Sequence, residues 1–135
     1  MAYFLLKTEP STYSWADLEK QKRATWDGVA NPVAIQHMRA AKTGDRVVIY
    51  HTGDERRAVG LAEIVSEARP DPTEARQVVF DLVPVKHLVL PVELAALKAA
   101  PAFADSPLVK MGRLSVVPLT DTQWRKLLAL SNTHW

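Results

Sequence analysis

The segment from Ala58 to Ala68 alternates strictly between two faces, and small side chains gather on one of them. One face carries Gly60, Ala62, Ile64 and Ala68, and the other carries Leu61, Glu63, Val65 and Glu67. A period of two is typical of a β-strand, whose successive side chains point to opposite faces. Small residues on the inward face leave room inside a curved sheet. The pattern therefore predicts a strand that lines a small barrel.

Other segments add strands and helices without a repeated strand-helix-strand unit. We predict further strands over Tyr3 to Lys7, Arg46 to His51, Val78 to Leu88 and Leu114 to Leu119. We predict helices after Ser14, from Pro32 until Gly44, over Pro91 to Ala100 and after Thr120. Because strands outnumber helices, the chain is expected to have an α+β fold, a closed β-barrel of about five to six strands flanked by helices.

Local motifs mark several of these boundaries. Ser14 with Asp17 forms a capping-box pattern, and Asn31 before Pro32 matches an N-cap followed by the first helical position. Thr120 with Gln123 repeats the capping pattern near the end of the chain. Pro84 inside a strand predicts a bulge or an edge there.

The composition limits the class of protein. The 135 residues fit a single domain over 1–135, and the net charge of +2 is too small to identify a partner. The chain has no cysteine, which excludes disulfides and thiolate metal sites and suits a cytoplasmic location. The apolar start, Met1 to Leu6, is too short for a signal peptide or a membrane span. We expect no membrane association, no cofactor and no metal.

Trp26-Asp27-Gly28-Val29, followed by Asn31, is the first candidate for a binding site. The indole offers a flat surface on which a planar ring can stack, Gly28 lets the backbone approach a ligand, and Asn31 provides a donor and an acceptor. The alternative is that Trp26 fills the core, as most tryptophans do.

Tyr50-His51-Thr52 is the second candidate, because it combines stacking and hydrogen-bonding groups at the end of a strand. Equally, Tyr50 could be an ordinary core residue and Thr52 the start of a turn.

The remaining histidines are isolated and are interpreted as structural. Basic residues form small groups at Lys20, Lys22 and Arg23, at Arg56 and Arg57, and at Lys110 and Arg113. Such groups could hold phosphates or simply be solvated.

In order and spacing, a set of short motifs along nearly the whole chain resembles the EVE domain family, which is part of the PUA-like superfamily with the YTH readers of methylated adenine. The motifs are Lys7-Thr8-Glu9-Pro10, Tyr13-Ser14, Trp26-Asp27-Gly28-Val29 with Asn31, Tyr50-His51-Thr52, Gly60-Leu61-Ala62-Glu63, Pro70-Asp71-Pro72-Thr73 and Gly112-Arg113-Leu114-Ser115-Val116.

The resemblance implies a PUA-like barrel and a pocket for an extruded, modified base, with methylated or hydroxymethylated cytosine in DNA the usual proposal. It assigns Trp26 to stacking, Thr8 and Asn31 to the polar edge of the base, and the opposite wall to Tyr50, His51 and Thr52. Lys7 and Asp27 belong to the same ligand-binding set, and Arg113 and Ser115 would stand near phosphates or the pocket rim.

The chain departs from the family pattern at Thr8, where serine is common, and at Ala30 and Pro32, where arginine and an aromatic residue are typical. Its connection from Asp71 to Arg76 is also short. Losing an arginine at position 30 removes a phosphate or base contact, and losing an aromatic residue at position 32 opens the pocket. The identity of the base is therefore less determined than the fold.

We therefore expect a reader that is not an enzyme, that binds nucleic acid containing modified bases, DNA rather than RNA, and that acts as a monomer or weak dimer with a separate effector protein. Two alternatives remain. One is a base-excising enzyme with Asp27 or Glu9 as general base. The other is a module that binds a small ligand or a protein, with its tryptophans in the core.

Overall fold

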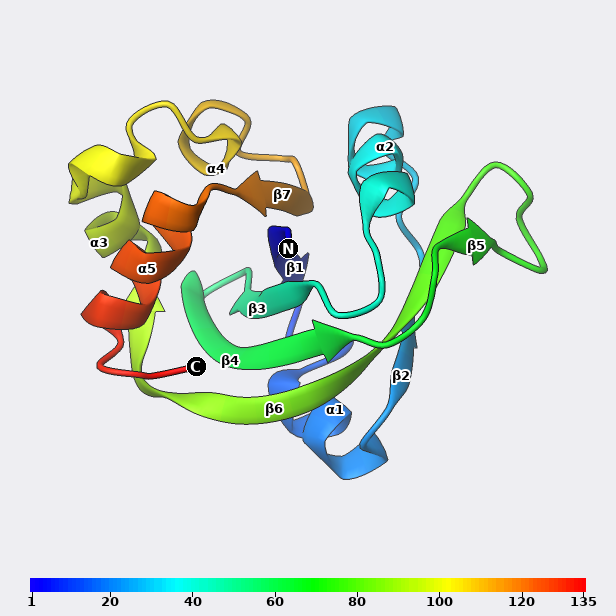
Figure 1. The fold of residues 1–135 in the computed structure, drawn as a ribbon, viewed down its shortest axis with the longest axis horizontal. Helices are drawn as coiled ribbons and strands as arrows, with labels where there is room; N and C mark the ends of the chain where they lie inside the picture. Colours follow the sequence, from blue (N-terminus) through cyan, green and yellow to red (C-terminus); the bar gives the residue numbers. More distant parts are fainter.

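The computed structural model describes the whole chain, residues 1–135, as one curled sheet with helices packed around it (Figure 1). The strands are β1 (Tyr3–Thr8), β2 (Ala24–Trp26), β3 (Arg46–His51), β4 (Arg57–Ile64), β5 (Arg69–Pro70), β6 (Val78–Glu93) and β7 (Val116–Leu119). The helices are α1 (Trp15–Gln21), α2 (Pro32–Ala40), α3 (Leu94–Ala99), α4 (Pro107–Lys110) and α5 (Asp121–Leu130), with a 3-10 turn η1 (Pro101–Phe103).

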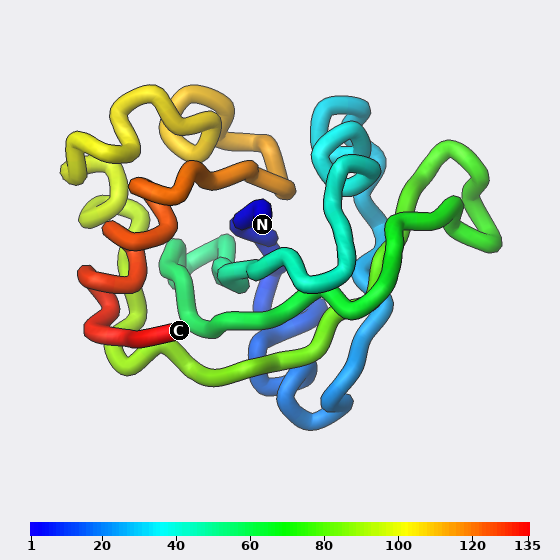
Figure 2. Tube along the Cα trace, viewed as in Figure 1, coloured from blue at the N-terminus to red at the C-terminus, as the bar shows by residue number.

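The strands pair in the order β2-β6-β4-β3-β1-β7, and β5 pairs with β6 outside this path. β1 and β3 run parallel, and the other ladders are antiparallel. The sheet curls into a half-barrel, with β1 near the middle of the molecule and β6 sweeping around it (Figure 2). Helix α2 packs against β7 and β6. The predicted α+β fold, a strongly curved sheet flanked by helices, is confirmed, although β2 and β7 at the two ends of the strand order do not pair, so the barrel stays open.

β6 is longer than predicted. We expected Val78 to Leu88 to be a strand and Pro91 to Ala100 to be a helix, but the strand continues to Glu93 and the helix begins at Leu94. The reason is pairing with β4, because Ala58 lies opposite Val92, which is buried. Register shifts between Leu61 and Ala62, where the partner moves from Lys86 to Pro84, are the bulge expected at that proline.

The predicted helix caps are present. Ser14 and Asp17 form a complete capping box at α1, and Thr120 and Gln123 form another at α5. At α2, Oδ1 of Asn31 accepts hydrogen bonds from two backbone N–H groups of the first turn. That helix ends at Ala40, before the predicted stop at Gly44. The sequence therefore predicts the N-caps of these helices correctly, but it does not predict the C-terminal end of α2.

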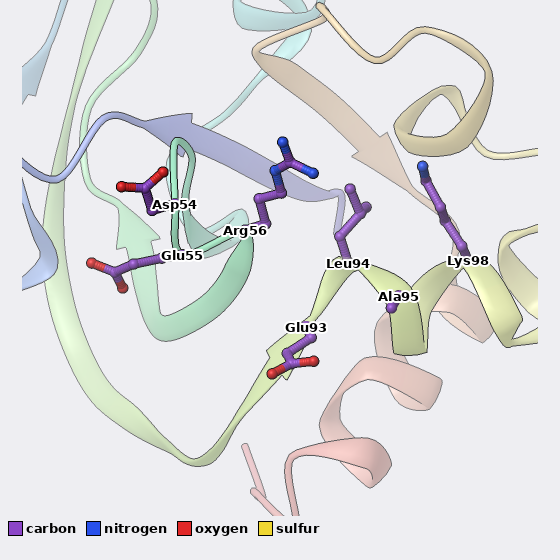
Figure 3. Close-up of a pocket in the computed structure, with 7 residues that line it drawn as sticks. All are labelled: Asp54, Glu55, Arg56, Glu93, Leu94, Ala95 and Lys98. Atoms are coloured by element: carbon purple, nitrogen blue, oxygen red, sulfur yellow. The ribbon is translucent and has the colours of Figure 1, made fainter.

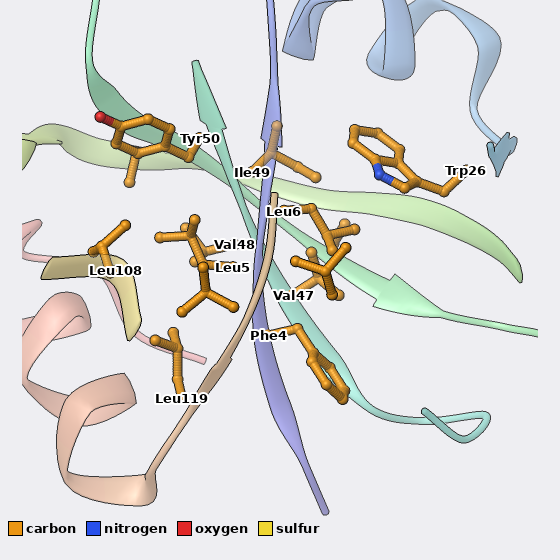
Figure 4. Packing of buried hydrophobic residues seen from close by; sticks show 14 of the residues in the cluster. Phe4, Leu5, Leu6, Trp26, Val47, Val48, Ile49, Tyr50, Leu108 and Leu119 are labelled. Carbon is orange, nitrogen blue, oxygen red and sulfur yellow. The ribbon is translucent and has the colours of Figure 1, made fainter. Parts of the chain in front are cut away.

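The hydrophobic core follows both faces of the central strands. Figure 4 shows Trp26 on one side of β1, where Phe4 and Leu6 also extend, and Tyr50 and Leu108 on the other side. The room left by the small residues of β4 is occupied: a Cβ added at Gly60 would meet the indole of Trp15 at 2.4 Å. The missing side chain thus makes space for α1.

No helix in the structure combines the length and the apolar character that a membrane span needs.

Candidate functional site

A hollow of about 910 Å³ lies beside Trp26, between the end of β1, the segment before α1, the end of α1, and β2 with the residues that follow it. Its lining residues are Lys7, Thr8, Thr12, Tyr13, Gln21, Arg23, Ala24, Thr25, Trp26, Asp27, Gly28, Val29 and Ser115. We call this hollow the Trp26 cavity. It holds five of the predicted site residues together, namely Lys7, Thr8, Trp26, Asp27 and Ser115.

Trp26 is held in place rather than freely exposed. Its surface is 7% accessible, and the ring of Tyr13 meets it edge-on with the two centroids 6.0 Å apart. The hydroxyl of Tyr13 donates a hydrogen bond of 2.6 Å to Oε1 of Gln21, which ties this ring to the end of α1. The indole is therefore both a core residue and part of a cavity wall. The binding-site interpretation and the core interpretation of Trp26 are therefore each consistent with part of its environment.

Thr8 presents an acceptor to the cavity. Its hydroxyl donates to the carbonyl oxygen of Tyr13 at 2.6 Å, which uses its only proton and leaves oxygen lone pairs free. Asp27, a second acceptor, lies on the same lining. A ligand that offers N–H or O–H donors fits these two groups.

The backbone after β2 turns sharply at Gly28, whose φ is +75°. An L side chain is strained in this conformation, although a Cβ there would meet nothing within 4 Å. The glycine is therefore required by the turn and not by a close ligand. Asn31, three residues further on, is exposed and lies outside the lining; its Oδ1 caps α2, so only its amide N–H₂ remains for a ligand.

An ion-pair cluster borders the cavity at Arg23. The carboxylate of Asp81 accepts hydrogen bonds from Arg69 at 2.9 Å, Thr25 at 2.8 Å and Arg23 at 3.0 Å. These donors lower the pKa of Asp81 from its ordinary 3.8 to about 2. Two arginines share one carboxylate, so the cluster keeps a net positive charge at the rim. The sequence indicates Arg23 only as part of a basic group. In the structure it lies just before β2, whose Thr25 pairs with Asp81 on β6.

The structure does not place Tyr50 opposite Trp26. Lys7 and Tyr50 are register partners on β1 and β3, and the Lys7 ammonium lies 5.9 Å from the centre of the Tyr50 ring. Thr8, the next residue on β1, points to the opposite face, because side chains alternate along a strand. Figure 4 shows Trp26 and Tyr50 on opposite sides of β1. Tyr50 therefore does not line the same hollow as Trp26, and its contact with a ligand stays a prediction.

Tyr50 and Thr52 instead line a smaller hollow of about 200 Å³, which we call the Tyr50 cavity. Its other lining residues include Lys7, Arg56 and Lys98. Burial raises the pKa of Tyr50, and the nearby charge of Arg56 opposes this shift. Lys7 borders both cavities, and its ammonium donates to the carbonyl oxygen of Gly112 at 2.9 Å.

His51 lines neither cavity, and its predicted contact with the ligand stays a prediction. Its Nε2 accepts a hydrogen bond of 3.0 Å from the backbone N–H of Trp15, and its Nδ1 lies 3.0 Å from Oε1 of Glu55. Accepting at Nε2 requires the proton to be on Nδ1, which then donates to Glu55. This hydrogen bond lowers the pKa of Glu55. His51 thus joins β3 to the start of α1.

Arg113 also lies outside both linings and is exposed, although Ser115, two residues later, lines the Trp26 cavity. Tyr13 is a wall of the cavity that is not among the predicted site residues, although Tyr13-Ser14 is one of the family motifs. Its position beside a capped helix and its place in a family motif were the available signals. No group of three or more His, Cys, Asp or Glu side chains is placed to hold a metal ion.

Comparisons with known proteins agree with this geometry. The structure superposes on the NMR structure of Rpa0253 from Rhodopseudomonas palustris with a TM-score of 0.92 and 42% identity, over 98% of this chain and 94% of that one. It superposes on the crystal structure of human THYN1 protein in complex with 5-methylcytosine-containing DNA with a TM-score of 0.91 and 25% identity, over 100% of both chains.

Sequence comparison gives the same result. Mouse thymocyte nuclear protein 1 is 30% identical over an alignment of 168 positions, which covers 98% of this chain and 74% of the mouse protein. A family model described as EVE domain matches residues 2–130. Because that match takes in almost every element of the half-barrel, the chain belongs to the EVE domain family.

Proposed function

We propose that this protein is a non-enzymatic reader that binds nucleic acid through one extruded, modified base held in the Trp26 cavity. The observation that carries the proposal is the position of Trp26 on a hollow lined by acceptors, in a fold that superposes on a THYN1 protein crystallised with 5-methylcytosine-containing DNA. An extruded base is read by stacking and by hydrogen bonds to its polar edge. Both kinds of contact are available on this lining.

Cytosine suits the chemistry of the lining. Its N4 amino group is a donor, and carboxylates are the usual acceptors for it. Asp27 and the hydroxyl oxygen of Thr8 supply such acceptors, and the indole of Trp26 supplies the stacking surface. Stacking of one base on an aromatic side chain is worth about 1–3 kcal/mol. We propose methylated or hydroxymethylated cytosine in DNA as the preferred ligand.

The test is a titration of wild-type protein with matched duplexes that carry one cytosine, 5-methylcytosine or 5-hydroxymethylcytosine, and with the corresponding RNA. We expect tighter binding to a modified duplex and a loss of that preference in Trp26→Ala. Because Trp26 belongs to the core, Trp26→Phe is measured beside it, and circular dichroism establishes that each variant folds. Asp27→Asn should weaken binding of cytosine forms without a loss of stability.

Trp135→Ala is the matched control, because Trp135 packs against Trp124 and Arg46, away from the cavity. It should keep the preference for the modified duplex. Equal affinity of the wild-type protein for all duplexes and RNAs, or an unchanged preference in both Trp26 variants, would overturn the proposal.

A base-excising enzyme is the second candidate, because Asp27 lies on the cavity as a single carboxylate. Glu9 is less suited to this role, since hydrogen bonds from Ser11 lower its pKa and a general base acts best when its pKa lies near the working pH. Incubation with a modified duplex followed by detection of released base distinguishes the enzyme from the reader. A monomer or weak dimer with a separate effector, at a cytoplasmic location, stays a prediction.

A further inference from the structure

The Tyr50 cavity carries cationic side chains with no acidic partner. Among its lining residues, Arg56 and Lys98 form no ion pair, and Lys7 donates only to the carbonyl oxygen of Gly112. The carboxylates that do form ion pairs with arginine or lysine lie outside this cavity; Asp81, for example, pairs with Arg23 and Arg69. Three cations around one hollow of about 200 Å³ therefore lack compensation from the protein itself.

Acidic residues lie nearby but point elsewhere. Asp54, Glu55 and Glu93 line an adjoining hollow of about 390 Å³, which also contains Arg56 and Lys98. Figure 3 shows the charged ends of Arg56 and Lys98 extending to the same side, while the carboxylates of Glu55 and Glu93 extend away from it. Glu55 is also engaged by His51 and Arg57. The positive ends are thus left to face the Tyr50 cavity.

Burial lowers the pKa of Lys7, because removal from water disfavours the charged ammonium. An anion bound there would offset the repulsion among the three charges. Lys7 also lies on the Trp26 cavity, so the two hollows meet at this side chain.

We propose that Lys7, Arg56 and Lys98 form a phosphate-binding site, and that the phosphate comes from the nucleic-acid backbone next to the extruded base. The source of the phosphate rests on the proposed function, since an extruded nucleotide in the Trp26 cavity brings its strand to Lys7. Phosphate contacts fix the position of a strand without reading its sequence. This site would therefore contribute affinity and register, while the Trp26 cavity contributes selectivity.

The test uses the double variant Arg56→Gln/Lys98→Gln, which removes two charges and keeps a polar side chain at each position. Arg125→Gln/Lys126→Gln on α5 is the matched control, with the same loss of charge outside both cavities. Binding of modified and unmodified duplexes is measured by fluorescence anisotropy at several salt concentrations. In parallel, inorganic phosphate is titrated into ¹⁵N-labelled protein at low salt, and amide shifts at Thr52, Gly53 and Lys98 are followed.

We expect the double variant to bind both duplexes roughly tenfold more weakly at low salt and to reduce the slope of log K against log salt by about 2, with selectivity for the modified base unchanged. The control should match wild type. Loss of phosphate-induced shifts with unchanged duplex binding would assign the site to a free phosphate or nucleotide instead of the backbone. If the double variant keeps both its duplex affinity and its phosphate-induced shifts, the proposed site is wrong, whether or not Trp26 selects a modified base.

Discussion

Replacing Gly60 by alanine tests the packing of α1 against β4. The added Cβ would lie 2.4 Å from Cδ2 and Cε3 of the Trp15 indole, whereas carbon atoms pack best at about 3.5–4.0 Å. The ring would have to withdraw by at least about 1 Å. Trp15 has little room to move, because it is buried and its backbone N–H is held by His51 at 3.0 Å.

Overpacking of this kind costs about 1–3 kcal/mol, and a weakened hydrogen bond to His51 adds about 1 kcal/mol. We expect a total loss of about 2–4 kcal/mol in the free energy of unfolding, or roughly 8–16 °C in Tm for a domain of this size. Urea and thermal denaturation followed by circular dichroism measure both quantities.

Gly112→Ala is the matched control, because a Cβ there would meet nothing within 4 Å and neither glycine has a positive φ. Its stability should stay within about 0.5 kcal/mol of wild type. In a Trp15→Leu background the cost of Gly60→Ala should largely disappear, since the colliding ring is gone. A Gly60→Ala protein as stable as wild type, or an equal cost in both backgrounds, would refute the reasoning.

Two further predictions concern electrostatics and capping. The lowered pKa of Asp81 should contribute about 1 kcal/mol, after allowance for solvent around its exposed arginine partners. This stability is present above pH 4 and is lost as the pH falls toward 2. The free energy of unfolding, measured by urea denaturation, should therefore fall less steeply between pH 4 and 2 in Asp81→Asn than in the wild type. An equally steep fall in both proteins would contradict this prediction. Asn31→Ala should cost about 1 kcal/mol, whereas Asn31→Ser should retain the cap but lose the amide; equal stability of the two would disprove the capping role.

Much of the fold could be predicted because local chemistry and periodicity agreed. Ser14, Asn31 and Thr120 are capping residues before helical segments, and each one caps a helix. The boundary at Glu93 could not be predicted, because alanines and leucines after Pro91 favour a helix locally, while pairing of Val92 with Ala58 extends the strand. That pairing joins residues far apart in sequence.

The candidate site was predictable only in part for a related reason. Trp26, Asp27 and Thr8 come from motifs with clear chemistry, and the structure brings them to one hollow. Tyr50 and His51 carry equally suitable groups, but strand register places one on the opposite face and buries the other against Trp15. Residue type indicates what a side chain can do, whereas register decides which cavity it reaches.

The central claim is that a modified base enters the hollow beside Trp26. The most direct measurement follows the indole N–H signals of ¹⁵N-labelled protein during titration with a duplex that carries one 5-methylcytosine. The signal of Trp26 and the amides of Asp27 and Gly28 should shift strongly, while the indole of Trp135 stays in place. Shifts at Trp135 with an unmoved Trp26 signal would contradict the claim.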